Sequence, residues 1–74
     1  MRPGVPPELR GGVIVAGAGV SGIGMANLLR DIGVAVLVAD DSDAGRARAE
    51  DAGHRAVSTA DARGYFGEVG AVVT

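Results

Sequence analysis

The chain has 74 residues, which is enough for one small domain, and its 47% hydrophobic content with a single Tyr and a single Phe indicates an aliphatic core. The net charge of −2, with acidic residues and arginines interspersed, offers no basic surface for nucleic acid or for a membrane. No cysteine is present and all seven basic residues are arginine, which excludes disulfides, thiolate metal sites, a cysteine nucleophile and a phosphate-loop lysine within this sequence.

Residues 1–11 contain three prolines and are predicted to form a flexible leader ahead of a domain at residues 12–74. The domain begins with the apolar, β-branched run Val13–Ala16, which is typical of a buried strand. Glycines follow at once in the spacing G-x-G-x-x-G, and a helical pattern comes next. Strand, glycine turn and helix in this order predict a phosphate-binding loop, which we call the glycine loop (residues 17–22).

Each glycine of the loop has a separate physical reason. Gly17 allows a sharp turn out of the strand, Gly19 removes a Cβ where the backbone must approach a pyrophosphate, and Gly22 lets the helix lie against the strand. The backbone N–H groups of Val20, Ser21 and Gly22 then point outward at the positive end of the helix dipole, and the Ser21 hydroxyl adds a donor. We therefore expect this loop to bind an anion.

A helix is predicted from about Val20 to Asp31, ended by Gly33 and followed by the parallel strand Val34–Ala39. The face laid on the sheet is predicted to consist of Gly22, Met25, Leu28, Leu29 and Ile32. Asp40 follows the second strand, where a dinucleotide fingerprint carries an acidic residue. It is predicted to accept hydrogen bonds from a ribose or a base.

A short second helix, Ala44–Ala52, is predicted next, capped by Ser42 or Asp43, with Arg46, Arg48, Glu50 and Asp51 on its solvent side. Strands are predicted at Arg55–Ser58 and Gly70–Thr74, with a turn or brief helix at Thr59–Phe66 between them. The fold class is therefore α/β, a Rossmann-like parallel sheet with flanking helices in strand order 3-2-1-4, truncated after about four strands. We expect the chain to be a partial nucleotide-binding domain, a fragment of a longer protein.

Several features have less specific interpretations. The uncharged stretch from residue 11 to residue 29 could suggest a membrane span or a secretory signal, but its glycines and the strand–helix–strand continuation favour the nucleotide-binding fold. His54 is the only histidine and is expected in a solvated loop, with Asn27 exposed and Tyr65–Phe66 forming a small core cluster. No nucleophile–base pair, carboxylate dyad or metal-ligand spacing is evident, so we expect binding without catalytic residues.

The segments Val13–Gly22, Gly33–Asp41 and Ala71–Thr74 together resemble the N-terminal domain of the muramyl ligases. In that family the domain holds the diphosphate of a UDP-linked substrate instead of a dinucleotide. The resemblance implies that the UDP-binding residues are Gly17, Gly19, Val20, Ser21 and Gly22 at the diphosphate, with Asp40 and Asp41 at the uracil end.

For the whole protein, the resemblance implies a cytoplasmic, ATP-dependent amide ligase of peptidoglycan synthesis that joins D-glutamate to UDP-N-acetylmuramoyl-L-alanine. ATP and Mg²⁺ would bind in central and C-terminal domains, and no cofactor is expected in this segment. Two alternatives stay open. An NAD- or FAD-binding domain of an oxidoreductase, or an NAD-sensing module, would use Asp40 on an adenosine ribose equally well. The second alternative is a purely structural domain with a degenerate loop.

Overall fold

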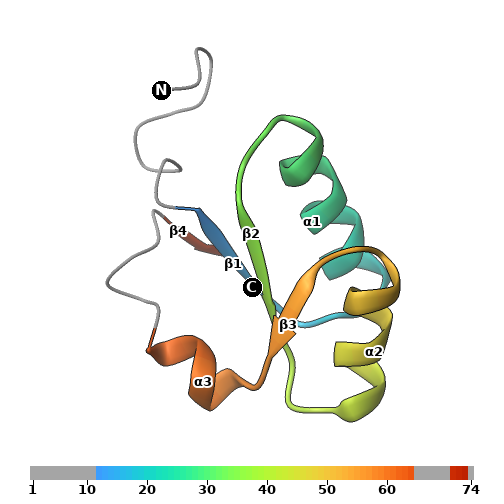
Figure 1. Ribbon diagram of the computed structural model, residues 1–74, viewed down its shortest axis with the longest axis vertical. Helices are drawn as coiled ribbons and strands as arrows, with labels where there is room; N and C mark the ends of the chain where they lie inside the picture. The colour runs from blue at the N-terminus through green and yellow to red at the C-terminus, as the bar shows by residue number, and fades with distance from the viewer. Residues whose placement is uncertain (1–11, 65–70, 74) are drawn as a thin grey trace.

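The computed structural model describes residues 12–64 and 71–73, which form a parallel sheet in the order β3-β2-β1-β4 with three helices (Figure 1). The leader, the Tyr65–Phe66 pair, Gly70 and Thr74 lie outside the described residues. The elements in chain order are β1 (Val13–Ala16), α1 (Val20–Asp31), β2 (Val36–Ala39), α2 (Asp43–Asp51), β3 (Arg55–Val57), α3 (Thr59–Arg63) and β4 (Ala71–Val73). The α/β class and the 3-2-1-4 order predicted from the sequence are confirmed.

The main boundary difference lies between α1 and β2, which begins at Val36, two residues later than predicted. Gly33 adopts a φ of 88°, and its N–H donates to the Arg30 carbonyl over 2.9 Å. The Val34 N–H donates to the Leu29 carbonyl over 3.0 Å, which completes a Schellman motif. Val34 therefore still belongs to the helix termination, and regular strand pairing starts only after it.

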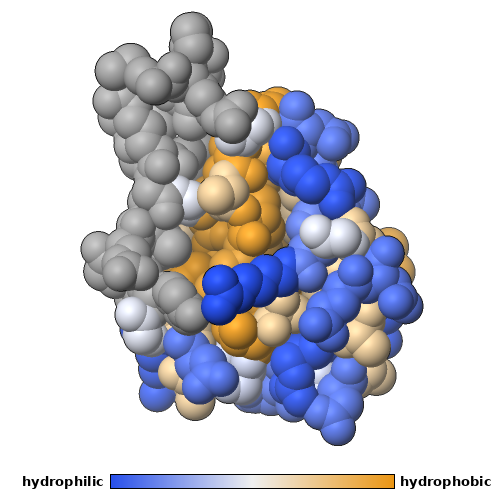
Figure 2. All heavy atoms as spheres, viewed as in Figure 1, coloured by the Kyte–Doolittle hydropathy of each residue, from blue (hydrophilic) through white to orange (hydrophobic). Residues whose placement is uncertain are grey.

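The sheet has two unequally covered faces (Figure 1). On one face, Val13, Val15 and Val38 pack with Ala26 of α1 and Ala49 of α2. The opposite face carries a smaller cluster of Ile14 and Ala39 with Ala62 of α3, against which Leu37 and Val57 are partly buried. Figure 2 shows apolar surface over the middle of the viewed face, where the strands lie, bordered by polar surface on the helices.

The predicted apolar face of α1 is partly wrong. Met25, Leu28 and Ile32 are 41%, 65% and 59% exposed. Gly22 and Leu29 pack toward the sheet as predicted, and they are joined there by Ile23 and Ala26. The helix is apolar on two neighbouring flanks, and the flank with glycine and alanine is the one that permits the close approach required at Gly22.

Candidate nucleotide-binding site

The glycine loop joins β1 to α1 with the geometry expected of a phosphate-binding turn. Gly17 has a φ of 100°, and its N–H donates to the Ala39 carbonyl over 2.7 Å, which anchors the turn to the end of β2. Gly19 is the N-cap of α1 and supplies no side-chain acceptor, and no acidic residue lies in the first turn. A Cβ at either glycine would meet no atom within 4 Å. The loop therefore leaves open space in front of the first-turn amides.

Gly22 lies where α1 crosses the start of the loop. A Cβ at this position would stand 1.9 Å from the carbonyl oxygen and 3.0 Å from the carbonyl carbon of Gly17. Both are backbone atoms, so no side-chain rotation could relieve the overlap. The predicted need for glycine at this crossing is confirmed.

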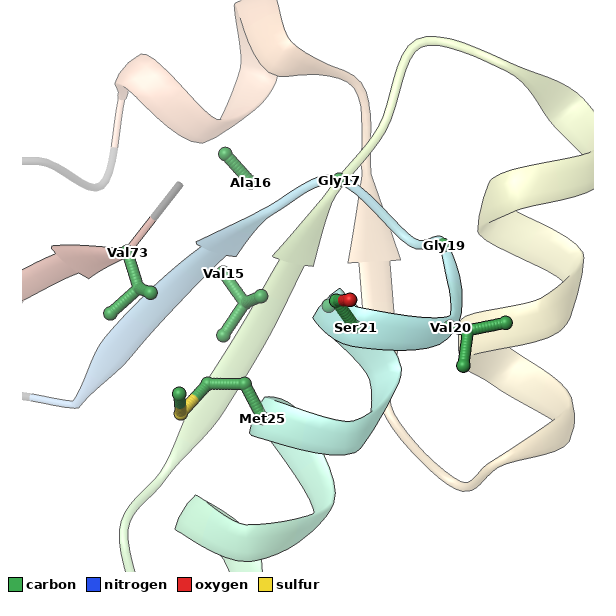
Figure 3. Close-up of a pocket in the computed structure, with 9 residues that line it drawn as sticks. Val15, Ala16, Gly17, Gly19, Val20, Ser21, Met25 and Val73 are labelled. Carbon is green, nitrogen blue, oxygen red and sulfur yellow. The ribbon is translucent and has the colours of Figure 1, made fainter.

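A hollow of about 460 Å³ opens in front of the loop between β1, β4 and the start of α1 (Figure 3). Its lining consists of Val15, Ala16, Gly17, Gly19, Val20, Ser21, Gly22, Met25 and Val73. In Figure 3, Val15 and Met25 project toward the space next to Val73, whereas Val20 projects toward α2. The hollow thus lies beyond the carboxyl ends of β1 and β4, where the strand order reverses and where ligands of doubly wound sheets bind.

A second hollow of about 430 Å³ lies on the other flank of α1. It is lined by Gly19, Val20, Ile23, Gly24, Asn27, Arg48 and Asp51, so it adjoins the same loop from the side of α2. Together the two hollows leave the start of α1 accessible from both sides.

Asp40 lies at the end of β2 and is held by three donors. Its Oδ2 accepts from the Ala18 N–H over 2.8 Å, and its Oδ1 accepts from both the N–H and the hydroxyl of Ser42, each over 2.8 Å. These hydrogen bonds, with a smaller contribution from Arg48, lower the pKa of the carboxyl to about 2. Asp40 is therefore a carboxylate at neutral pH, with most of its acceptor positions already used within the protein.

Gly45 on α2 makes this position of Asp40 possible. A Cβ on Gly45 would stand 2.4 Å from the Asp40 carboxyl carbon, so any side chain there would displace the carboxylate. Ser42, at the start of the same helix, is the N-cap, and its Oγ accepts from the Gly45 N–H over 2.9 Å. The carboxylate is thus seated against the beginning of α2.

Asp41 is exposed, and its Oδ1 accepts from the Thr59 N–H over 3.0 Å at the start of α3. It therefore serves as a cap for a neighbouring helix, and its role toward a ligand stays a prediction. Sequence reasoning missed Arg48, whose Nε donates to the Ala18 carbonyl over 3.0 Å. A contact across 30 positions leaves no local pattern in the sequence.

The prediction for His54 and Asn27 is wrong. His54 is only 6% exposed, and its Nε2 lies 2.7 Å from Asn27 Oδ1, so Asn27 is half-buried as well. Burial, and secondarily the charge of Arg30, lowers the pKa of the imidazole. The pair links α1 to the residue before β3. The local sequence around either residue does not indicate this contact.

The described part of the chain contains no cluster of three or more His, Cys, Asp or Glu residues suited to a metal ion. In that same part, no helix combines the length and the apolar character needed to cross a membrane.

The fold, the glycine loop and the hollow at the switch in strand order are those of a Rossmann-like unit, a fold that commonly binds nucleotides at this place. The sequence is 44% identical over 71 residues to the UDP-N-acetylmuramoylalanine–D-glutamate ligase of Corynebacterium efficiens, which covers 95% of this chain. It is 52% identical over 56 residues to the enzyme of the same name from Corynebacterium diphtheriae, which covers 74% of this chain. The resemblance predicted from the motifs is confirmed.

The match accounts for a small part of these curated relatives, since the chain spans 15% and 12% of their lengths. No family model matches the sequence. No solved structure matches it either.

Proposed function

We propose that this chain is the UDP-binding part of an ATP-dependent ligase that adds D-glutamate to UDP-N-acetylmuramoyl-L-alanine in cytoplasmic peptidoglycan synthesis. The observation that carries the proposal is the open glycine loop at the start of α1, in a sequence 44% and 52% identical to two ligases of that name. The diphosphate would lie against the N–H groups of Val20, Ser21 and Gly22, with the Ser21 hydroxyl as a further donor.

The uracil would lie near the end of β2. Asp40 Oδ1 already accepts two hydrogen bonds, whereas Oδ2 accepts one from Ala18. A carboxylate oxygen offers about two acceptor positions, so Oδ2 has one left for a ligand donor. A single acceptor suits the edge of a base.

The dinucleotide alternative fits this arrangement less well. An adenosine ribose presents two neighbouring hydroxyl groups, and an acidic residue that accepts from both of them uses both of its oxygens. In this chain Oδ1 of Asp40 is occupied by Ser42. Asp40 held in this way could accept from one ribose hydroxyl and not from both, and together with the identity to the two ligases this supports a uridine nucleotide over NAD or FAD.

The described residues contribute binding to the proposed reaction. In the proposed ligase the substrate carboxylate would become an acyl phosphate, which the amine of D-glutamate would attack with release of phosphate. ATP, Mg²⁺ and the residues for these steps would lie in central and C-terminal domains. This segment would fix the UDP end of the substrate.

The proposal is tested by calorimetry on the complete gene product that contains this chain, with UDP, UDP-N-acetylmuramoyl-L-alanine and NAD as ligands. We expect both uridine nucleotides to bind and NAD to bind far more weakly. Tighter binding of NAD than of UDP would overturn the proposal and favour the oxidoreductase alternative.

A matched pair of variants locates the site. A Cβ at Gly19 or at Gly24 meets nothing within 4 Å, so we expect the fold to tolerate a leucine at either position. Gly19→Leu places its side chain over the loop, where the diphosphate would lie, and should weaken UDP binding by about tenfold or more, on the scale of a lost charge-assisted hydrogen bond. Gly24→Leu lies a turn further along α1 and should leave binding near that of the unmodified protein. Equal binding by the two variants would place the nucleotide elsewhere.

A further inference from the structure

Ala18, which lies between the first two glycines of the loop, is held from two sides by side chains outside the loop. Ala18 is fully buried. Its N–H donates to Asp40 Oδ2 at the end of β2 over 2.8 Å, and its carbonyl accepts from Arg48 Nε on α2 over 3.0 Å. We call this pair of contacts the Ala18 clamp (Asp40 and Arg48).

Both halves of the clamp depend on α2. Arg48 lies on this helix, and the Asp40 carboxylate is fixed by Ser42 at the N-cap of the helix and seated against Gly45 in its first turn. Arg46 of the same helix donates from Nη1 to the Asp40 carbonyl over 2.8 Å. The loop backbone is therefore tied to α2 at one defined position, in addition to its covalent links to β1 and α1.

We propose that Arg48 is a positioning residue of the nucleotide site, which acts through the Ala18 carbonyl to hold the glycine loop in the conformation that receives a diphosphate. The inference rests on the proposed function, because it takes the diphosphate as the group bound by the loop. Ala18 precedes the N-cap Gly19, so its carbonyl lies just before the amides that would face the ligand. A loop fixed before the ligand arrives saves the entropy of ordering it on binding, which strengthens binding.

The competing explanation is that Arg48 acts by its positive charge. A guanidinium near a phosphate site attracts an anion whether or not it touches the loop. The two explanations differ in what the side chain must supply, since positioning needs an N–H at the place of Nε and attraction needs the charge. A pair of substitutions separates them.

Arg48→Gln keeps an N–H donor at the same number of bonds from Cα as Nε and removes the charge. Arg48→Met has a similar length but removes both the donor and the charge. Arg48 is exposed, so we expect both variants to fold. Calorimetry with UDP on the complete gene product should show binding about 3- to 10-fold weaker for Arg48→Met, the scale of one lost hydrogen bond, and within about twofold of the unmodified protein for Arg48→Gln.

A second comparison uses UDP and uridine in competition. Because the clamp acts on the amides that face the diphosphate, Arg48→Met should weaken the binding of UDP more than the binding of uridine. Equal losses for the two ligands would contradict positioning of the loop.

Two further results would overturn the inference and leave the proposed function standing: unchanged UDP binding in Arg48→Met, or equal weakening in Arg48→Met and Arg48→Gln. If instead the unmodified protein binds NAD and not UDP, the proposed function fails. The same pair of variants is then measured with NAD, whose pyrophosphate would use the same loop, and rescue by glutamine again decides for positioning.

Discussion

Replacement of Gly22 by alanine tests the contact that brings α1 onto the end of β1. The new Cβ would stand 1.9 Å from the carbonyl oxygen of Gly17, whereas ordinary contacts of a Cβ begin at 3.4 Å. Backbone atoms form the obstacle, so α1 or the loop must move by more than 1 Å. At Gly24, two residues further along the same helix, an added Cβ meets nothing within 4 Å.

Two effects change the stability of these variants: helix propensity acts at both positions, and overpacking acts at one of them. Alanine is preferred over glycine in a helix by roughly 1 kcal/mol, and this gain applies at both positions. Overpacking costs about 1–3 kcal/mol or more and applies only at Gly22. The propensity gain cancels in the comparison, so Gly22→Ala should be less stable than Gly24→Ala by about 1–3 kcal/mol or more.

Urea unfolding of the 74-residue chain, followed by circular dichroism, measures this difference directly. In a thermal melt it corresponds to roughly 4–8 °C for each kcal/mol in a domain of this size. Gly24→Ala should equal or exceed the unmodified protein in stability. A Gly22→Ala variant as stable as Gly24→Ala would refute the close crossing of α1 over the loop.

Two further outcomes are expected from the described contacts. The pKa of His54 in the folded chain lies below the ordinary 6.5, so the unfolded chain binds the proton more tightly. The contribution of neutral His54 to stability is therefore present above pH 6.5 and is lost as the pH falls below 6.5. His54 is the only histidine, so the slope of unfolding free energy between pH 7.5 and pH 5.5 should shrink in His54→Gln, and an unchanged slope would contradict its burial. Ser42→Ala removes the acceptor for the Gly45 N–H and should lower the free energy of unfolding in urea by about 0.5–2 kcal/mol. Ser21 is exposed, so Ser21→Ala serves as the control and should change that free energy little. Equal losses of stability in the two variants would argue against the cap.

The sequence predicted the features that depend on neighbouring residues. The turn at Gly17, the helix end at Gly33 and a cap at Ser42 or Asp43 each follow from backbone or side-chain chemistry within a few positions, and all three are confirmed, with Ser42 as the cap. The strand order followed from the connection rules of parallel sheets. These local and topological rules place the loop and the hollow in front of it.

Contacts between distant residues could not be predicted in the same way. His54 pairs with Asn27, and Arg48 reaches Ala18, across 27 and 30 positions. The prediction of the buried face of α1 was partly wrong for a related reason. The helix has two apolar flanks, and local periodicity does not indicate which of them meets the sheet. Close approach at Gly22 selects the flank of small residues and leaves Met25 toward the hollow.

Asp40 shows why the acidic residue of a nucleotide fingerprint cannot be assigned to the ligand alone. Its carboxylate connects β2, the glycine loop and α2 through hydrogen bonds that hold its pKa near 2. Because the folded pKa lies below the ordinary 3.8, this contribution to stability is fully present above pH 3.8 and is lost as the pH falls toward 2.

At neutral pH the loop is therefore fixed by a permanently charged acceptor. In the proposed complex, the remaining acceptor position of Oδ2 would meet the ligand, and the same oxygen accepts from the Ala18 N–H. In that complex, the geometry of the loop and the recognition of the group beyond the diphosphate would both depend on this one side chain, so a substitution of Asp40 alone would not separate the two roles. The Arg48 variants do separate them, because Arg48 bonds the loop backbone at Ala18 and leaves the carboxylate of Asp40 in place.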